Sequence, residues 1–157
     1  MKTNIFNADF QDFIRALNAA EVDYLVVGGY AVILHGYNRT TGDLDVWVRK
    51  SSANYQRLAK AFHQFGMPVF DMTEENFLHN PALDVFSFGV PPVSIDLMTE
   101  TKGLNFDQAF KQAQWFELED FKIRVLHFQD LLDAKTAANR PKDQEDIRQL
   151  QLKNQSL

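Results

Sequence analysis

Two aspartates lie inside an apolar run in the segment VVGGYAVILHGYNRTTGDLDVWV, residues 26–48. Read as a strand, residues 43–48 put three apolar side chains on one face, and Asp43 and Asp45 on the other together with Trp47, because successive side chains alternate. An ionised carboxylate that faces a low-dielectric interior is costly unless it is paired, hydrogen-bonded or bound to a metal. The pattern therefore requires either a solvated strand face or a bound cation.

A third carboxylate has a similar setting. Asp96 lies in the apolar run VSIDLM, where Ser94, Asp96 and Met98 share one face of a predicted strand. Hard oxygen ligands of this kind suit Mg²⁺, and three converging acids can hold two ions about 4 Å apart for an in-line displacement at phosphorus. The acids thus favour phosphoryl or nucleotidyl transfer, and a charged, solvent-facing strand is the alternative.

The glycine pair bears on that choice. Gly28 and Gly29 end the apolar run DYLVV, and a short helix over residues 30–34, closed by Gly36, is predicted to follow. Glycines between a strand and a helix let the backbone approach a phosphate and direct its N–H groups at it. A tight turn without a ligand is the alternative for the pair taken alone.

Periodicity predicts a mixed, mostly antiparallel sheet flanked by helices, an α/β (α+β) fold. We expect a first helix to about Ala20 with Asn7 or Asp9 as N-cap, and a helix after Ser51 or Ser52 that ends at Gly66. Strands are predicted at 83–88 and 93–98, joined through Gly89, Pro91 and Pro92. A helix near 107–114, a hairpin over 115–126 and two C-terminal helices separated by Pro141 complete the order.

Bulk properties narrow the class of protein. A chain of 157 residues with 45% hydrophobic content suits a single domain, residues 1–157, with a substantial core. It contains no cysteine, and we find neither a secretory apolar core nor a stretch of the roughly 20 apolar residues that spans a bilayer. We expect a cytoplasmic protein with no membrane partner. The net charge of −5 argues against a broad footprint for duplex nucleic acid and favours a small or metal-neutralised ligand.

With these residues in place, the chain resembles the nucleotidyltransferases of the DNA polymerase beta superfamily, whose signature is an apolar strand, Gly-Gly or Gly-Ser, a short helix and Asp-x-Asp on the next strand. The form with His35-Gly36, Arg39, Thr40 and Thr41 is similar to the bacterial minimal branch of abortive-infection toxin type and DUF6036-like proteins, and more distantly to lincosamide-modifying enzymes. The closing segment FQDLLDAKTAANRPKDQEDIRQL also resembles that branch. The resemblance covers residues 23–150 or so and implies a polymerase-beta-like core.

The resemblance implies roles for individual residues. Asp43, Asp45 and Asp96 would bind magnesium, most simply as two ions, and act as the catalytic carboxylates, with Asp96 as candidate general base. Gly28 and Gly29 would approach the triphosphate, Lys135 would touch the nucleotide, and Arg39 and Thr40 are candidates for phosphate contact. Gly29 departs from the serine of many relatives, so any contact of that hydroxyl is missing.

The C-terminal charges have simpler interpretations as well. Lys135 lies on an amphipathic helix, where a solvated position or a pair with Asp130 or Asp133 is the default, and Arg140 and Lys142 could complete a basic wall opposite the acids. Asp143 and Asp146 are expected to serve helix-dipole and ion-pair roles. Trp47 could stack on a base or pack in the core.

The leading hypothesis is a magnesium-dependent nucleotidyltransferase that moves a nucleoside monophosphate, from ATP or another triphosphate, to a hydroxyl acceptor. RNA, protein hydroxyls and small molecules stay open as acceptors, and a protein partner or a second copy of the chain could complete the acceptor pocket. One alternative is a non-catalytic relative that serves as a nucleotide sensor or as half of a toxin-antitoxin pair. A structural partner-binding domain with an exposed acidic strand is the other.

Overall fold

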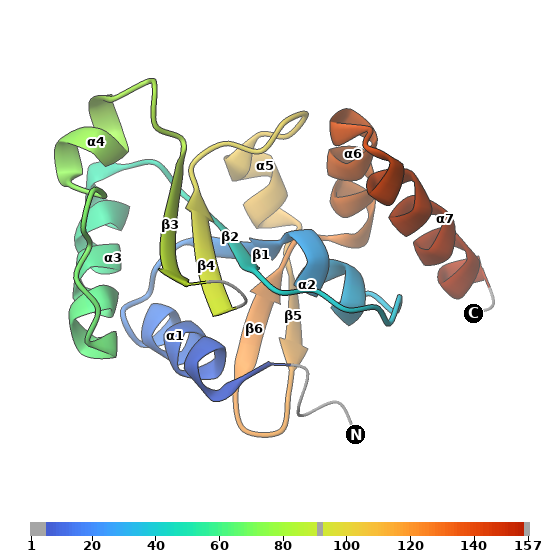
Figure 1. The fold of residues 1–157 in the computed structure, drawn as a ribbon, viewed down its shortest axis with the longest axis horizontal. Coiled ribbons are helices and arrows are strands. Elements are labelled where there is room, and N and C mark those ends of the chain that lie inside the picture. Colours follow the sequence, from blue (N-terminus) through green and yellow to red (C-terminus); the bar gives the residue numbers. More distant parts are fainter. Residues whose placement is uncertain (1–5, 91–92, 156–157) are drawn as a thin grey trace.

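The computed structural model describes residues 6–90 and 93–155 and contains one six-stranded sheet in the order β3-β4-β2-β1-β6-β5. Three of its pairings are antiparallel, β1 with β2, β3 with β4 and β5 with β6, and two are parallel, β1 with β6 and β2 with β4. The predicted mixed, mostly antiparallel sheet flanked by helices is confirmed (Figure 1). The strands are β1 Tyr24–Val27, β2 Leu44–Val48, β3 Val85–Val90, β4 Val93–Met98, β5 Gln114–Glu117 and β6 Lys122–Val125.

Helices lie at both ends of the sheet. In Figure 1, α3 and α4 stand beside β3 at the left of the view, and α6 and α7 stand together at the right. None of the helices in the described part of the chain is both long and apolar enough to cross a membrane. The helices are α1 Ala8–Ala19, α2 Gly28–Leu34, α3 Ser52–Phe65, α4 Glu74–His79, α5 Phe106–Lys111, α6 Phe128–Ala138 and α7 Pro141–Gln155.

Local signals set several of these boundaries as expected. The Asn7 side chain caps α1 by accepting the Phe10 N–H at 2.8 Å, and Ser51 caps α3 in the same way. Gly66 ends α3 in the left-handed region, at φ +86°, where a residue with a Cβ would be strained. Pro141 opens α7 at its first residue, because its missing N–H has no intrahelical partner there.

The structure also corrects some boundaries. α2 begins at the glycine pair itself, not after it, so both glycines belong to the helix. α5 ends at Lys111, because residue 114 already pairs in β5, and β3 starts and ends two residues later than predicted. The short α4, with its Thr73 cap, was missed. The turn predicted at Pro91 and Pro92 lies outside the described residues, and Gly89 lies within β3.

Aromatic side chains build much of the core. Phe13 of α1 packs edge-on against Phe62 of α3, with ring centroids 5.6 Å apart, and Phe62 in turn meets Phe88 of β3 at 4.8 Å. Trp47 of β2 is 1% exposed and lies edge-on to Phe106 of α5 at 5.1 Å. The packed interpretation of Trp47 is therefore correct, since a fully covered indole offers no free face for a base.

Sheet topology places the ends of four strands at one edge. β2 runs antiparallel to β1 and parallel to β4, and β6 runs parallel to β1. The edge where β1 and β6 end is therefore the edge where β2 and β4 begin. The chain leaves β1 into α2 at this edge and leaves β6 toward α6 close by, while Asp43 lies just before β2.

Candidate active site

The chain leaves β1 directly beside the second aspartate. Val27 pairs with Asp45 across β1 and β2, and Gly28 follows Val27 in the left-handed region at φ +67°. A Cβ at Gly28 would lie 2.2 Å from Oδ2 of Asp45, a distance that van der Waals contact forbids. Position 28 must therefore be glycine for two independent reasons, and the missing side chain lets the backbone lie against the carboxylate.

Gly29 is required for a different reason. A Cβ there would lie 2.3 Å from Oγ1 and 2.8 Å from Cβ of Thr41. The Thr41 side chain thus fills the space that a serine at position 29 would need. This neighbour gives the physical reason for the departure from Gly-Ser, and it places a hydroxyl from the loop beside the start of α2.

Two of the three predicted acids, Asp45 and Asp96, lie on neighbouring strands, and Asp43 lies just before β2. Asp96 pairs in register with Asp45 across the parallel strands β4 and β2. Asp43 is exposed and accepts a 2.6 Å hydrogen bond from Oγ of Ser94, which is buried. Ser94 was not a predicted site residue, although its position two residues before Asp96, on the same strand face, was the signal that could have found it.

The pKa of Asp45 is strongly raised. Burial, and then the charges of Asp96 and Asp43, raise its pKa from 3.8 to about 6, while Lys135 and Lys142 partly oppose the increase. The carboxylates are therefore close enough to repel one another. A cation bound between them would relieve that repulsion.

Asp43 and Asp45 open into a cavity of about 320 Å³, which we name the site cavity. Four cationic side chains share its walls with the two acids and the glycine pair. Thr41, not the predicted Thr40, lines it; Thr40 is exposed, and its carbonyl accepts a hydrogen bond from Arg39. The full lining is Gly28, Gly29, Arg39, Thr41, Gly42, Asp43, Asp45, Lys135, Arg140 and Lys142.

Lys135 is not on a solvated face. Its side chain is 7% exposed, and Nζ lies 3.1 Å from Asp143 and 2.9 Å from Asp146, both on α7. The default pairing with Asp130 or Asp133 is therefore wrong, because α7 packs across the face of α6 that carries Lys135. The ion-pair role expected of Asp143 and Asp146 is confirmed, and it connects them to a residue of the site cavity.

The same two aspartates hold the cavity's arginines. Arg39 forms two hydrogen bonds with Asp146, 2.8 Å from Nε and 3.0 Å from Nη2, and Arg140 contacts Asp143 at 2.6 Å from Nε. Burial alone would raise the pKa of Asp143, but the hydrogen bonds from Arg140 and Lys135 outweigh it and lower the pKa to about 2. Asp143 therefore stays ionised at neutral pH, and the two aspartates together fix three cations at the cavity wall.

A second cavity of about 300 Å³, the α6 cavity, adjoins the site cavity and shares Gly28, Asp45, Lys135 and Arg140 with it. Apolar side chains from α6 and the strands form much of its wall, among them Leu131, Ala134 and Met98. The site therefore combines a strongly polar compartment with a more apolar one on either side of Asp45.

The donor set can be tested for a metal. Asp43 and Asp45 supply hard oxygen ligands at one cavity, with Asp96 in register beside them, which fits Mg²⁺ in chemical type. Within residues 6–90 and 93–155, however, no three acidic, histidine or cysteine side chains are grouped as a ready-made metal site. The expected convergence of three acids on two ions is therefore not preformed, and phosphate oxygens would have to complete any coordination.

Comparison with known proteins agrees with this geometry. Over 88% of both chains, the structure is similar to that of a proposed nucleotidyltransferase, TM1012, from Thermotoga maritima, with a TM-score of 0.59 and 15% identity. It is also similar to the lincosamide antibiotic adenylyltransferase LnuA, solved with lincomycin bound, with a TM-score of 0.56 and 16% identity over 94% of this chain and 98% of that one. These likenesses establish the fold.

The family assignment rests on the sequence itself. No curated protein matches the chain. The model of a family described as nucleotidyltransferases of unknown function, DUF6036, matches residues 8–156, which include the glycine pair, all three acids and the α6–α7 ion pairs. The chain therefore belongs to the DUF6036 family of nucleotidyltransferases.

Proposed function

We propose that this nucleotidyltransferase transfers a nucleoside monophosphate from a nucleoside triphosphate to a hydroxyl acceptor and depends on magnesium. One observation carries the proposal: two carboxylates and four cationic side chains line the same cavity, at a glycine pair whose backbone lies against Asp45. A triphosphate needs both kinds of group, because cationic side chains bind its oxygens directly and carboxylates bind the cation that travels with it.

The site cavity suits the β- and γ-phosphates. Arg39, Lys135, Arg140 and Lys142 surround it, and the first two are held in place by Asp146. Cations that are already oriented lose little entropy when a phosphate binds, and they stabilise the charge of the departing pyrophosphate. The hydroxyl of Thr41 adds a donor beside Gly29.

The α6 cavity suits the nucleoside. It continues from Asp45 along α6, and its apolar wall of Leu131, Ala134 and Met98 can cover a base and sugar that extend from the α-phosphate. This arrangement leaves the α-phosphate beside Asp45 and Asp96.

Magnesium, when bound, would be held by Asp43 and Asp45 with Asp96 beside them, and would neutralise phosphate charge near the reacting phosphorus. The oxygen of the acceptor hydroxyl forms a bond to the α-phosphorus, and the bond to the β-phosphate oxygen breaks. Pyrophosphate leaves with that electron pair, and Asp96 receives the hydroxyl proton. Ser94 keeps Asp43 oriented through its 2.6 Å hydrogen bond.

Labelled nucleotides test the proposal. Protein incubated with cell extract, magnesium and α-³²P-labelled ATP should transfer label to an acceptor, whereas γ-labelled ATP should not, because the γ-phosphate leaves with pyrophosphate. The Asp43→Asn/Asp45→Asn double variant should retain the fold and lose transfer, with exposed Asp84→Asn as the matched control. Undiminished transfer by the double variant would refute the assignment.

The alternatives predict different results. ATP binding detected by calorimetry without transfer to any acceptor would favour the nucleotide sensor or toxin-antitoxin partner. ATP binding that does not depend on magnesium would favour the partner-binding domain. A protein partner or homodimer stays a prediction, which size-exclusion chromatography with light scattering can examine.

A further inference from the structure

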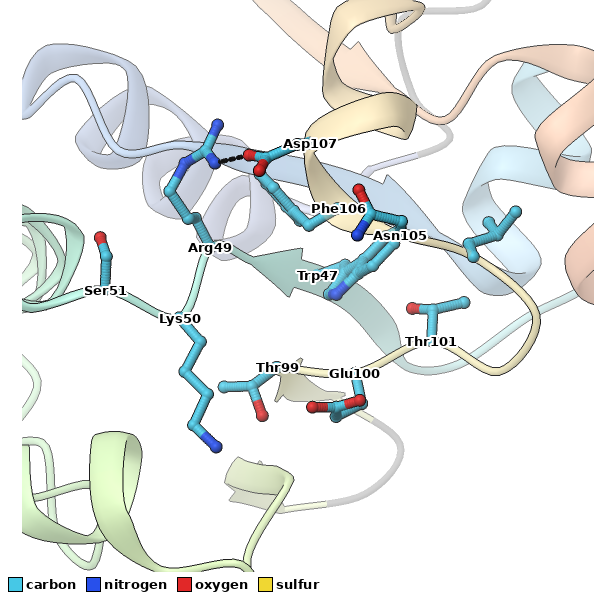
Figure 2. A pocket seen from close by; sticks show the side chains of 11 residues that line it. Trp47, Arg49, Lys50, Ser51, Thr99, Glu100, Thr101, Asn105, Phe106 and Asp107 are labelled. Carbon is cyan, nitrogen blue, oxygen red and sulfur yellow. Dashed lines mark hydrogen bonds and ion pairs between the residues drawn. The ribbon is translucent and has the colours of Figure 1, made fainter.

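A third cavity, of about 360 Å³, is lined by Trp47 and the residues around it (Figure 2). We name it the Trp47 cavity. It is formed where β2 and β4 end, by Trp47 and Lys50 from one segment, Thr99, Glu100 and Thr101 from the other, and Asn105 before α5. The proposed function above does not use it.

Three polar atoms at this cavity lack partners. Nε1 of Trp47 and the hydroxyls of Thr99 and Thr101 are buried and have no hydrogen-bond partner among the described residues. Trp47 is 1% exposed and Thr99 is 7% exposed. A buried donor or hydroxyl without a partner costs about 1–3 kcal/mol, so a cluster of three at one cavity indicates that a bound molecule or water satisfies them.

Figure 2 shows how these groups lie. The indole of Trp47 lies between Phe106 and the segment that carries Thr99 and Thr101, and its nitrogen is turned toward that segment. The indole can only donate, whereas each hydroxyl can donate and accept. A ligand that serves all three must offer an acceptor to the indole, and adjacent hydroxyl groups, which both accept and donate, can pair with the two threonine hydroxyls in either orientation.

Charge at the cavity is balanced. Lys50 and Glu100 are exposed charges of opposite sign at its wall, and Arg49 is already engaged by Asp23, at 2.7 Å, and by Asp107. A free anion such as phosphate would therefore find no surplus of positive charge, unlike in the site cavity. The walls favour a neutral molecule.

The position relative to Asp45 gives the cavity a role in the reaction. Trp47 and Met98 pair across β2 and β4, one same-face step, about 7 Å, after Asp45 and Asp96. The Trp47 cavity also shares Glu100 and Thr101 with the α6 cavity, which contains Asp45. The two cavities therefore adjoin along that segment.

Gly29, Thr41 and Asp43 lie toward the opposite end of β2, where the pyrophosphate is placed. A molecule in the Trp47 cavity therefore lies on the side of Asp45 and Asp96 away from the proposed leaving group. In-line displacement requires attack from that side.

We propose that the Trp47 cavity binds the acceptor, and that the acceptor is a neutral, hydroxyl-rich small molecule of monosaccharide size. This inference rests on the proposed function for its chemistry: one hydroxyl oxygen of the bound molecule forms the bond to the α-phosphorus, its proton passes to Asp96, and pyrophosphate leaves. Binding itself rests on the cavity and its unpartnered groups alone.

Indole NMR tests the binding site. The chain has two tryptophans, Trp47 and the half-exposed Trp115, so a ¹⁵N-labelled sample gives one indole N–H signal for each, assigned with Trp115→Phe. Methyl β-D-glucopyranoside and myo-inositol are the probes, with inorganic phosphate as the anionic control. We expect a saturable shift of the Trp47 signal with at least one probe, none with phosphate, and no shift of Trp115.

Matched variants locate the effect. The Thr99→Val/Thr101→Val variant removes both hydroxyls while the side chains keep nearly the same shape, and it should weaken probe binding about tenfold or more. The Thr99→Ser/Thr101→Ser variant keeps both hydroxyls and should retain probe binding. An unchanged melting temperature and an unchanged Trp115 indole signal show that the valine pair is folded, and the single Thr99→Val variant, whose side chain does not line the α6 cavity, serves if the pair does not fold. No saturable Trp47 shift with either probe, or equal binding by the valine variants, would overturn the site.

The test separates this inference from the proposed function. The Asp43→Asn/Asp45→Asn variant should no longer bind the nucleotide but should still bind the probe. If wild-type protein binds the probe but never ATP, the proposed function fails and the cavity loses its acceptor role. If it transfers AMP to RNA in the extract and binds neither probe, the proposed function stands and this inference fails.

Discussion

Replacing Asp45 with asparagine should stabilise the metal-free protein at neutral pH. Burial, followed by the charges of Asp96 and Asp43, raises the pKa of Asp45 from 3.8 to about 6. At neutral pH the wild-type fold therefore holds an ionised group in a setting that favours the neutral form. Asparagine is close to isosteric and carries no charge, so Asp45→Asn removes that penalty.

The magnitude follows from the pKa increase. Each pH unit is worth about 1.4 kcal/mol, so a pKa raised from 3.8 to about 6 corresponds to at most about 3 kcal/mol. Asp45 is partly exposed, and solvent screening reduces the expected gain to about 1–2 kcal/mol. For a chain of this size, that gain raises the melting temperature by about 2–8 °C.

The pH dependence isolates the cause. Below about pH 3, Asp45 is protonated in both folded and unfolded chains, so wild type and variant should differ least. As the pH rises from about 4 to 6, the unfolded chain ionises first and the wild type loses stability relative to the variant. Above pH 6 the difference should be constant.

Thermal denaturation in EDTA, from pH 4 to 8, measures this difference, with exposed Asp84→Asn as the control that should leave the melting temperature nearly unchanged. Saturating magnesium and ATP should then stabilise the wild type more than the variant. A difference between Asp45→Asn and wild type that does not change with pH, or a variant less stable than wild type at pH 7.5, would refute the reasoning.

Other perturbations have equally definite outcomes. Gly29→Ser should lower both the melting temperature and the ATP affinity, because its Cβ would lie 2.3 Å from Oγ1 of Thr41. Adding Thr41→Gly removes that neighbour and should restore the melting temperature. A double variant that melts at as low a temperature as the single variant would contradict the clash. Asp146→Asn removes the charged partner of two cations at a 2% exposed position and should lower the free energy of unfolding in urea by about 3–5 kcal/mol. Exposed Asp133→Asn should cost less than about 0.5 kcal/mol, and equal losses would argue against the buried network. Magnesium-dependent ATP binding, measured by calorimetry, should weaken as the pH falls through about 6, where Asp45 takes up a proton. An ATP affinity that does not change between pH 5 and 8 would count against Asp45 as a ligand.

Local sequence patterns predicted most of the elements. Alternation identified β2 and β4, and capping residues such as Asn7, Ser51 and Gly66 fixed helix boundaries, because these signals act over a few residues. The short α4 was missed, since six residues carry little periodicity. The start of α2 was misplaced because glycine usually ends an element, and here it opens one.

The candidate site divides in the same way. The local pattern alone already links the glycine pair and the three acids to one kind of chemistry, because buried carboxylates need a cation and close backbone approach needs glycine. Register across β2 and β4, set by hydrogen bonding between distant segments, then placed Asp96 opposite Asp45.

The pairing of charged side chains depends on the packing of distant segments. Arg39 and Asp146 are 107 residues apart in the chain, and their pairing depends on α7 packing against α6 beside the Arg39 loop. Likewise, Thr41 replaces Thr40 at the cavity because of the space beside Gly29, and the unpartnered groups around Trp47 exist because two strand ends and α5 close over them. Such contacts depend on packing between segments that no local pattern connects. Local patterns therefore identify the charged and polar side chains, and the packing of the folded chain sets which of them are in contact.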